Sequence, residues 1–230
     1  MGRIGGALRA LCVAVALASA VPVLAESPRE MLVTAAFADH DRALALARIE
    51  RARVGASVLL GRRSDDQEAA LIHATALGYR AKLTGSRSDA IAARKQFEGL
   101  AARFPRNPET VAALGAWHVG AVVKLGRIGG RMALGAQKGV GLDALDRAVT
   151  LGGDRAMFLG LAGLLRLELD AHDPRALQLI QAAVHGATPT AIDRILQRAS
   201  IQVLAVLHKG DAKAAQKLAQ RLLPLGQLAN

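Results

Sequence analysis

Apolar residues recur along most of this chain at the three- and four-residue spacing of helices, and polar breaks divide them into segments. A first helix is expected after Ser27-Pro28, because serine caps a helix and proline is favoured in its first turn. Further helices are expected over about 41–60, 66–83 and 90–104. Apolar and polar positions seldom alternate with a period of two, so the pattern predicts an all-α protein.

The second half of the chain continues the helical pattern. The expected helices cover about 108–125, 142–151, 154–169 and 174–184, with a last pair between Pro189 and Pro224. The helix over 154–169 is apolar on nearly every side, which is typical of a helix buried on most sides. Residues 225–230 are expected to form a frayed end.

Glycines concentrate in one stretch, residues 126–141, with the sequence GRIGGRMALGAQKGVG. It holds six glycines in sixteen residues, together with Arg127, Arg131 and Lys138, and no acidic residue. Each glycine in a helix interior costs about 1 kcal/mol relative to alanine. We therefore expect this stretch to interrupt the helices as a basic, mobile insertion.

The first 25 residues are typical of an export signal. Arg3 and Arg9 precede an apolar run over 10–20, and small residues before Glu26 offer a cleavage site. The run is shorter than the about 20 residues that span a bilayer, so cleavage is favoured over an uncleaved anchor. Cleavage would also remove the single cysteine, Cys12, and we expect no transmembrane span in the remaining chain.

One helical pair carries a family-like pattern. Leu77-Gly78 stand in its first helix, Ala93 and Phe97 in its second, and Pro105 follows. This order resembles the tetratricopeptide (TPR) repeat, although Ala74 and Ala81 replace its tryptophan and tyrosine. Weaker copies of the pattern place further repeat-packing residues at Leu114, Gly115, Leu159, Gly160, Gly210 and Ala215.

The resemblance implies stacked antiparallel helical hairpins, a TPR-like α-solenoid over residues 66–224, with 26–65 as an N-terminal helical cap. Proteins of this kind usually bind peptides or proteins in a concave groove. The resemblance therefore favours a binding role over a catalytic one.

The formal charge of +11 indicates an anionic partner or surroundings. An exported protein seldom meets nucleic acid, and the basic insertion lacks the interleaved aromatic residues of a single-strand binder. An acidic protein face, phospholipid headgroups or anionic glycans are the expected counterparts.

Candidate chemistry is sparse. Residues 139–144 match the dinucleotide fingerprint G-x-G-x-x-A, but no strand is expected before them. Glu168, Asp170, His172 and Asp173 could ligate a metal, whereas the simpler interpretation makes Asp173 a helix cap. We predict no catalytic residue, no metal and no cofactor.

Two sets of residues are candidates for partner binding. Trp117 and His118 lie on the first helix of the second repeat, where a tryptophan could anchor an interface or could fill a gap in the core. Lys124, Arg127, Arg131 and Lys138 could bind carboxylate or phosphate groups, or could belong to a solvated linker.

These observations lead to two hypotheses. The first is a non-enzymatic periplasmic scaffold that binds a protein or peptide in the cell envelope. The alternative is a periplasmic carrier or transporter-accessory subunit that holds a small apolar molecule or lipid among the apolar helices.

Overall fold

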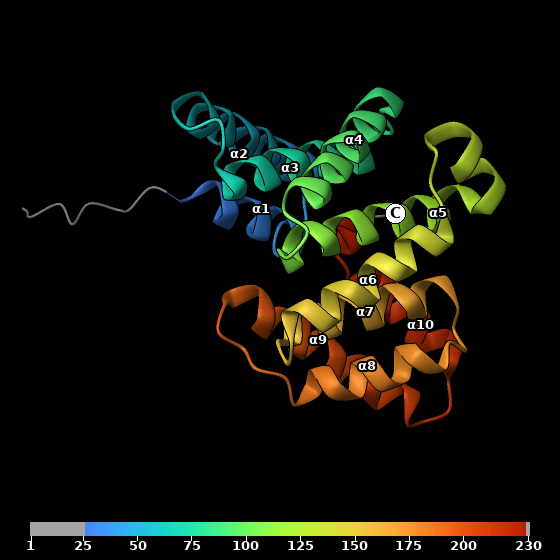
Figure 1. Ribbon diagram of the computed structural model, residues 1–230. Coiled ribbons are helices and arrows are strands. Elements are labelled where there is room, and N and C mark those ends of the chain that lie inside the picture. Colours follow the sequence, from blue (N-terminus) through green and yellow to red (C-terminus); the bar gives the residue numbers. More distant parts are fainter. Residues whose placement is uncertain (1–25, 229–230) are drawn as a thin grey trace, which may run out of the picture.

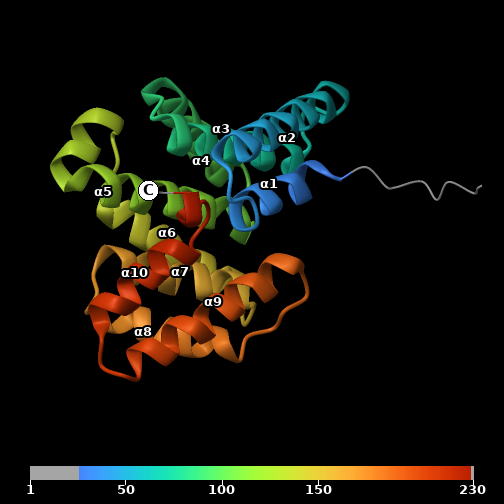
Figure 2. The same ribbon diagram turned by 180° about the vertical axis from the view of Figure 1, so that it is seen from behind.

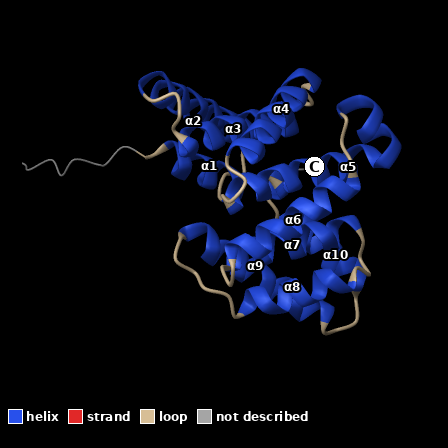
Figure 3. Ribbon diagram, viewed as in Figure 1, coloured by secondary structure: helices blue, strands red, loops and turns tan. Residues whose placement is uncertain are grey.

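The computed structural model describes residues 26–228, and within this part the chain is all-α (Figure 1, Figure 3). The described residues form no β-strand, apart from an isolated bridge between Arg155 and Ala187. The helices are α1 (Pro28–Phe37), α2 (Arg42–Arg62), α3 (Gln67–Thr84), α4 (Arg87–Arg103), α5 (Pro108–Leu134), α6 (Lys138–Gly152), α7 (Ala156–Leu169), α8 (Pro174–Val184), α9 (Ala191–Leu207), α10 (Ala212–Leu222) and the short 3-10 helix η1 (Gly226–Leu228).

Short polar side chains start most of these helices. The backbone N–H of Glu30 donates to the Ser27 hydroxyl across 3.2 Å, and the Glu30 carboxylate accepts the N–H of Ser27 in return. The cap of α4 is Ser86, so this helix begins three residues earlier than expected. Gly85 ends α3 in the left-handed conformation, and Ser86 starts α4 directly after it, which makes the turn shorter than the sequence suggested.

Consecutive helices pack against each other in antiparallel hairpins from α1 to α6 (Figure 1). In the α3–α4 hairpin, a Cβ added to Gly78 would lie 3.6 Å from the Phe97 ring and 3.7 Å from the Ala93 Cβ. The predicted packing of this pair is therefore confirmed. In the α5–α6 hairpin, a Cβ on Gly115 would lie 2.9 Å from the Gly141 carbonyl oxygen, so this close approach requires glycine.

The second half of the molecule is organised around α7. Every residue from Ala156 to Leu167 is buried, as the apolar sequence predicts. Helices α5, α6, α8, α9 and α10 all pack on it, so the later hairpins wrap around one central helix (Figure 2). A Cβ on Gly163 would lie 2.8 Å from Ile180 Cγ1 on α8, and one on Gly160 would lie 3.0 Å from Ser200 Oγ on α9. These two faces of α7 leave no room for a ligand.

Ion pairs connect the ends of α7 to its neighbours. At the N-terminal end, the buried Asp193 carboxylate accepts from the Met157 N–H across 3.0 Å and from Arg155 across 2.9 Å. At the other end, the buried Arg166 donates to Asp146 across 2.6 Å and to Asp173 across 3.1 Å. Charges inside a protein are tolerated when they are paired in this way.

The expectation of a frayed C-terminus was wrong for residues 225–228. Leu225 is fully buried in a core cluster with residues of α1, α2 and α3. Its N–H donates to the Ala36 carbonyl oxygen across 2.8 Å, and the Gln227 side chain donates to the carbonyls of Ala36 and Asp39. Figure 2 shows this segment reaching from α10 up to α1. The two ends of the described chain therefore contact each other.

The glycine-rich stretch also differs from the expectation. Helical structure continues to Leu134 after a break at Gly126, whose φ of 74° and ψ of 167° lie outside the helical region, and α6 already begins at Lys138. The helices tolerate the glycines because several lie at ends or close contacts: Gly135 caps α5 in the left-handed conformation and Gly141 packs on α5.

In the last hairpin, Ala215 is fully buried, as predicted for a repeat-packing residue. A Cβ added to Gly210 would meet no atom within 4 Å, and the φ of this glycine is +78°. Gly210 therefore lies in the turn between α9 and α10 and makes no close contact between helices.

Candidate binding surfaces

The end of α5 projects from the body of the molecule, and we call residues 124–138 the finger (Figure 1). The break at Gly126 turns the chain, so that the helical residues 127–134 fold back beside the preceding turns. A Cβ on Gly130 would lie 3.3 Å from the Ala121 carbonyl oxygen. The Gly130 side of the finger is therefore its inner face.

Two large apolar side chains are exposed on the finger. Ile128 is 77% exposed and Met132 is 80% exposed, the highest values among the large exposed hydrophobic residues of the described chain. A helix turns by about 100° per residue, so positions two before and two after Gly130 both point away from the inner face. Ile128 and Met132 therefore form one convex apolar tip, and Leu125, 44% exposed, lies just before the break.

The finger that carries this tip is positively charged. The predicted cations Lys124, Arg127, Arg131 and Lys138 all lie on the finger and are all exposed. No acidic residue occurs in the chain between Glu109 and Asp143. The finger thus carries only positive charges, together with an apolar tip.

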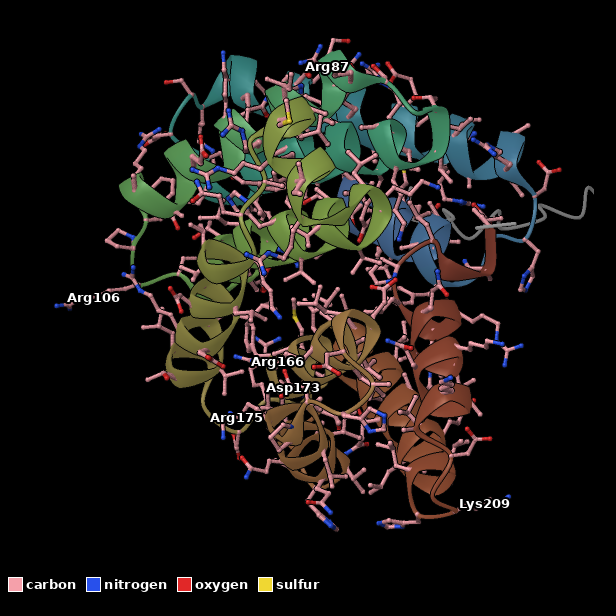
Figure 4. The ribbon with its side chains drawn as sticks, turned by 90° about the vertical axis from the view of Figure 1, so that its right-hand side faces the viewer. Arg87, Arg106, Arg166, Asp173, Arg175 and Lys209 are labelled. Atoms are coloured by element: carbon pink, nitrogen blue, oxygen red, sulfur yellow. The ribbon has the colours of Figure 1, made fainter. Side chains whose placement is uncertain are left out.

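Two arginines of α4, which no sequence pattern singles out, lie against the finger. Arg87 Nε donates to the Ala133 carbonyl oxygen across 2.9 Å (Figure 4). Arg94 lies beside Gly135, where an added Cβ would meet its guanidinium at 2.7 Å. Both cations sit at the C-terminal end of a helical segment, where the helix dipole favours positive charge. No sequence motif marks them, because they act through a contact between separate helices.

His118 is not available to a partner, because it is 2% exposed. Its Nδ1 accepts the backbone N–H of Gln137 across 3.1 Å, so the neutral ring carries its proton on Nε2. Burial, together with the positive charge of Arg94, lowers the pKa of His118 to about 4. The prediction that His118 binds a partner was therefore wrong, and its role is to hold the base of the finger.

Trp117 is half-buried and packs against the cluster that contains Leu71, Leu77 and Phe97. Its ring meets the His118 ring edge-on, with 5.1 Å between the centroids. This position fits the alternative in which the tryptophan fills a gap between small-residue helices. Trp117 and His118 are thus packing residues, whereas the four cations of the finger are exposed.

A hollow of about 240 Å³ lies where the two ends of the described chain meet. Half-buried Phe37, Ile195 and Leu222 contribute apolar surface, and exposed Arg198 and Arg221 contribute positive charge. The remaining lining residues are His40, Ala199, Gln202 and Gln227. We call this the terminal hollow. Sequence reasoning missed it because its walls come from α1, α9, α10 and the C-terminal segment, which no local pattern connects.

A second, wider hollow of about 410 Å³ surrounds the turn between α4 and α5. It is lined by Gln67, Phe104, Pro105, Arg106 and Asn107. Pro105 follows the end of α4, as predicted, and its carbonyl oxygen accepts from Arg147 across 2.7 Å. This hollow opens broadly to solvent and is mostly lined by one turn.

The other candidates of the sequence have structural roles. Residues 139–144 lie within α6, and a Cβ on Gly141 would be 3.0 Å from side-chain atoms of His118 and Val119, so this glycine serves helix packing. Asp173 caps α8, as the simpler interpretation predicted. Within residues 26–228, no group of three or more His, Cys, Asp and Glu side chains is placed to hold a metal.

Among the described residues, α5 is the one helix that is long and apolar enough to cross a membrane by length and composition. Part of it is buried against α4, α6 and α7, and its backbone breaks at Gly126. Residues 1–25, which carry the predicted export signal, lie outside the described part of the chain.

The arrangement combines a packed helical body with two surfaces suited to binding, the finger and the terminal hollow. Membership of the TPR family stays a prediction. Comparison of the chain with protein-family models, with curated proteins and with solved structures found no match.

Proposed function

We propose that the protein is a non-enzymatic helical scaffold of the cell envelope that binds a protein or peptide partner in the terminal hollow. The observation that carries this proposal is the lining of the hollow, which combines half-buried apolar side chains with two exposed arginines. Aromatic side chains and arginine are enriched in protein interfaces, and Phe37, Arg198 and Arg221 supply both kinds here.

The lining selects a kind of ligand. An apolar side chain of the partner would enter against Phe37, Ile195 and Leu222. Carboxylates beside it would accept hydrogen bonds from Arg198 and Arg221, whose planar guanidinium groups can bind a carboxylate with two parallel bonds. The partner would therefore present an apolar residue flanked by acidic ones.

A location in the periplasm rests on the export signal predicted in residues 1–25. The succession of helical hairpins supports a scaffold, since repeat-like helical proteins expose extended surfaces for binding. The alternative, a carrier of a small apolar molecule or lipid, would need free volume among the apolar helices. The close contacts of Gly160 and Gly163 argue against such volume on two faces of α7.

Site-specific crosslinking tests the proposal. A photoreactive amino acid replaces the exposed Gln202 in the hollow, and the protein is irradiated in cells of its native host. We expect one discrete protein adduct. The adduct should disappear when Arg198→Glu and Arg221→Glu are combined, because the reversed charges would repel an acidic partner.

A control pair makes the same change in charge elsewhere. Arg175→Glu with Lys209→Glu alters two exposed cations outside the hollow, and this variant should keep the adduct. Absence of a discrete adduct in the unaltered chain, or equal loss in both double variants, would contradict the proposal. Circular dichroism confirms that each variant is folded.

A further inference from the structure

We propose that the finger is a membrane-surface anchor, which places its apolar tip among the headgroups of an anionic phospholipid bilayer. This inference is independent of the terminal hollow, because none of the residues that line the hollow belongs to the finger. The shape, the exposure and the charge of the finger each contribute to the argument.

The shape of the finger fits a soft surface. Ile128 and Met132 lie one helical turn apart on the side opposite Gly130, so they protrude from the same face of the finger. A protein partner would have to supply a matching pocket for this convex tip. A bilayer needs no pocket, because apolar side chains on a surface helix enter the boundary between headgroups and acyl chains to a depth of about 5–10 Å.

Because the apolar tip is exposed to water in the free protein, its transfer into an apolar environment would be favourable. Side chains of this size are buried in most of the chain, yet Ile128 is 77% and Met132 is 80% exposed. Burial of such side chains in an apolar environment is favourable, and the gain is roughly proportional to the area covered. Leu125, 44% exposed, would extend the same contact.

The charge selects the lipid. Lys124, Arg127, Arg131 and Lys138 are exposed on the finger, and the stretch between Glu109 and Asp143 holds no acid to offset them. Each Lys or Arg near an anionic bilayer adds about 1 kcal/mol of attraction, which corresponds to about a fivefold gain in binding. The strength of such surface binding grows both with the apolar area inserted and with electrostatic attraction to anionic lipids.

The finger is held in a fixed orientation, which reduces the entropy lost on binding. The Arg87 guanidinium donates to the Ala133 carbonyl oxygen, and His118 accepts the Gln137 N–H at its base. Figure 4 shows Arg87 at the same end of the molecule as the finger. Its own exposed charge adds to the cations that would face the membrane.

Vesicle binding tests the anchor. The protein is purified from its native host, with the N-terminus that processing in the host produces. Mass spectrometry confirms the same N-terminus for every variant. Sedimentation then measures its partition onto vesicles of phosphatidylglycerol and phosphatidylethanolamine, and onto neutral vesicles of phosphatidylcholine. We expect binding to the anionic vesicles that is at least about tenfold stronger and that weakens with salt.

Matched variants separate the two contributions. Ile128→Ser with Met132→Ser should lower partition onto anionic vesicles at least about tenfold, since both apolar side chains are lost. Arg127→Glu with Arg131→Glu should lower it further. The controls, Leu177→Ser with Ile201→Ser on α8 and α9, change residues that are 38% and 47% exposed and should leave partition unchanged.

Three results would overturn the anchor. These are equal binding to neutral and anionic vesicles, equal losses in the finger and control variants, and a finger that crosslinks to a protein but does not bind vesicles. The Arg198→Glu and Arg221→Glu variant of the terminal hollow should bind vesicles normally. Failure of the proposed partner and failure of the anchor are therefore distinguishable.

Discussion

The backbone N–H of Leu225 donates to the carbonyl oxygen of Ala36 across 2.8 Å and so joins the last described turn of the chain to its first helix. Leu225 has a φ of 63°, the one positive value among the described residues other than glycine. A left-handed conformation costs a leucine roughly 1–2 kcal/mol. Complete burial of the side chain offsets this cost, so the contact is a structural feature that closes the helical array.

Leu225→Ala should therefore destabilise the whole protein by about 2–5 kcal/mol, since it leaves a cavity between the C-terminal segment and α1. Urea unfolding monitored by circular dichroism measures the change. Leu177→Ala on α8, where the side chain is 38% exposed, is the control and should cost much less. Equal effects of the two substitutions would show that the C-terminal segment does not hold the ends together.

His118 should make stability depend on pH. Its pKa is lowered to about 4 by burial and by the charge of Arg94, whereas an unfolded histidine titrates near 6.5. The unfolded chain therefore binds a proton first as pH falls. The stabilising contribution is complete above pH 6.5 and is lost as pH falls towards 4. At pH 4.5 the free energy of unfolding should be about 2–3 kcal/mol lower than at neutral pH for this reason.

Urea unfolding at pH 7 and pH 4.5 measures this contribution. His118→Gln keeps an acceptor for the Gln137 N–H but cannot be protonated, so its stability should change less between the two pH values. His208→Gln alters an exposed histidine and should retain the response of the unaltered chain. If both variants showed the same pH dependence of stability, His118 would not be its cause.

Two glycines in the interior of helices should change the stability of the protein in opposite directions when each is replaced by alanine. Gly163→Ala should destabilise by about 1–3 kcal/mol, because the new methyl group would lie 2.8 Å from Ile180 Cγ1 and 3.1 Å from the Ile180 nitrogen. Gly99→Ala on α4 meets no atom within 4 Å, so it should stabilise by about 0.5–1 kcal/mol through the better helix propensity of alanine. Thermal unfolding of both variants tests the pair, and a stable Gly163→Ala protein would show that α7 and α8 can separate.

The local features of the fold were accessible from the sequence. The capping box at Ser27, the helix after Asp173 and the contact of Gly78 with Phe97 each depend on residues within one helix or one hairpin. Such features follow from helix periodicity, capping and the size of side chains, which act over a few residues. The four cations of the finger could also be recognised, because they are close in sequence and no acid lies among them.

The sequence by itself determined a row of capped helices, a hairpin with small residues at its crossing, an apolar helix that had to be buried, and a basic tract. Only the tertiary structure decided that Gly126 breaks α5 so that Ile128 and Met132 project, that His118 is buried, and that Leu225 returns to α1. The physical reason is the range of the interactions. Periodicity and capping depend on residues close together in the sequence. Burial depends on which helices come into contact in the folded protein, and the residues adjacent in the sequence do not determine those contacts.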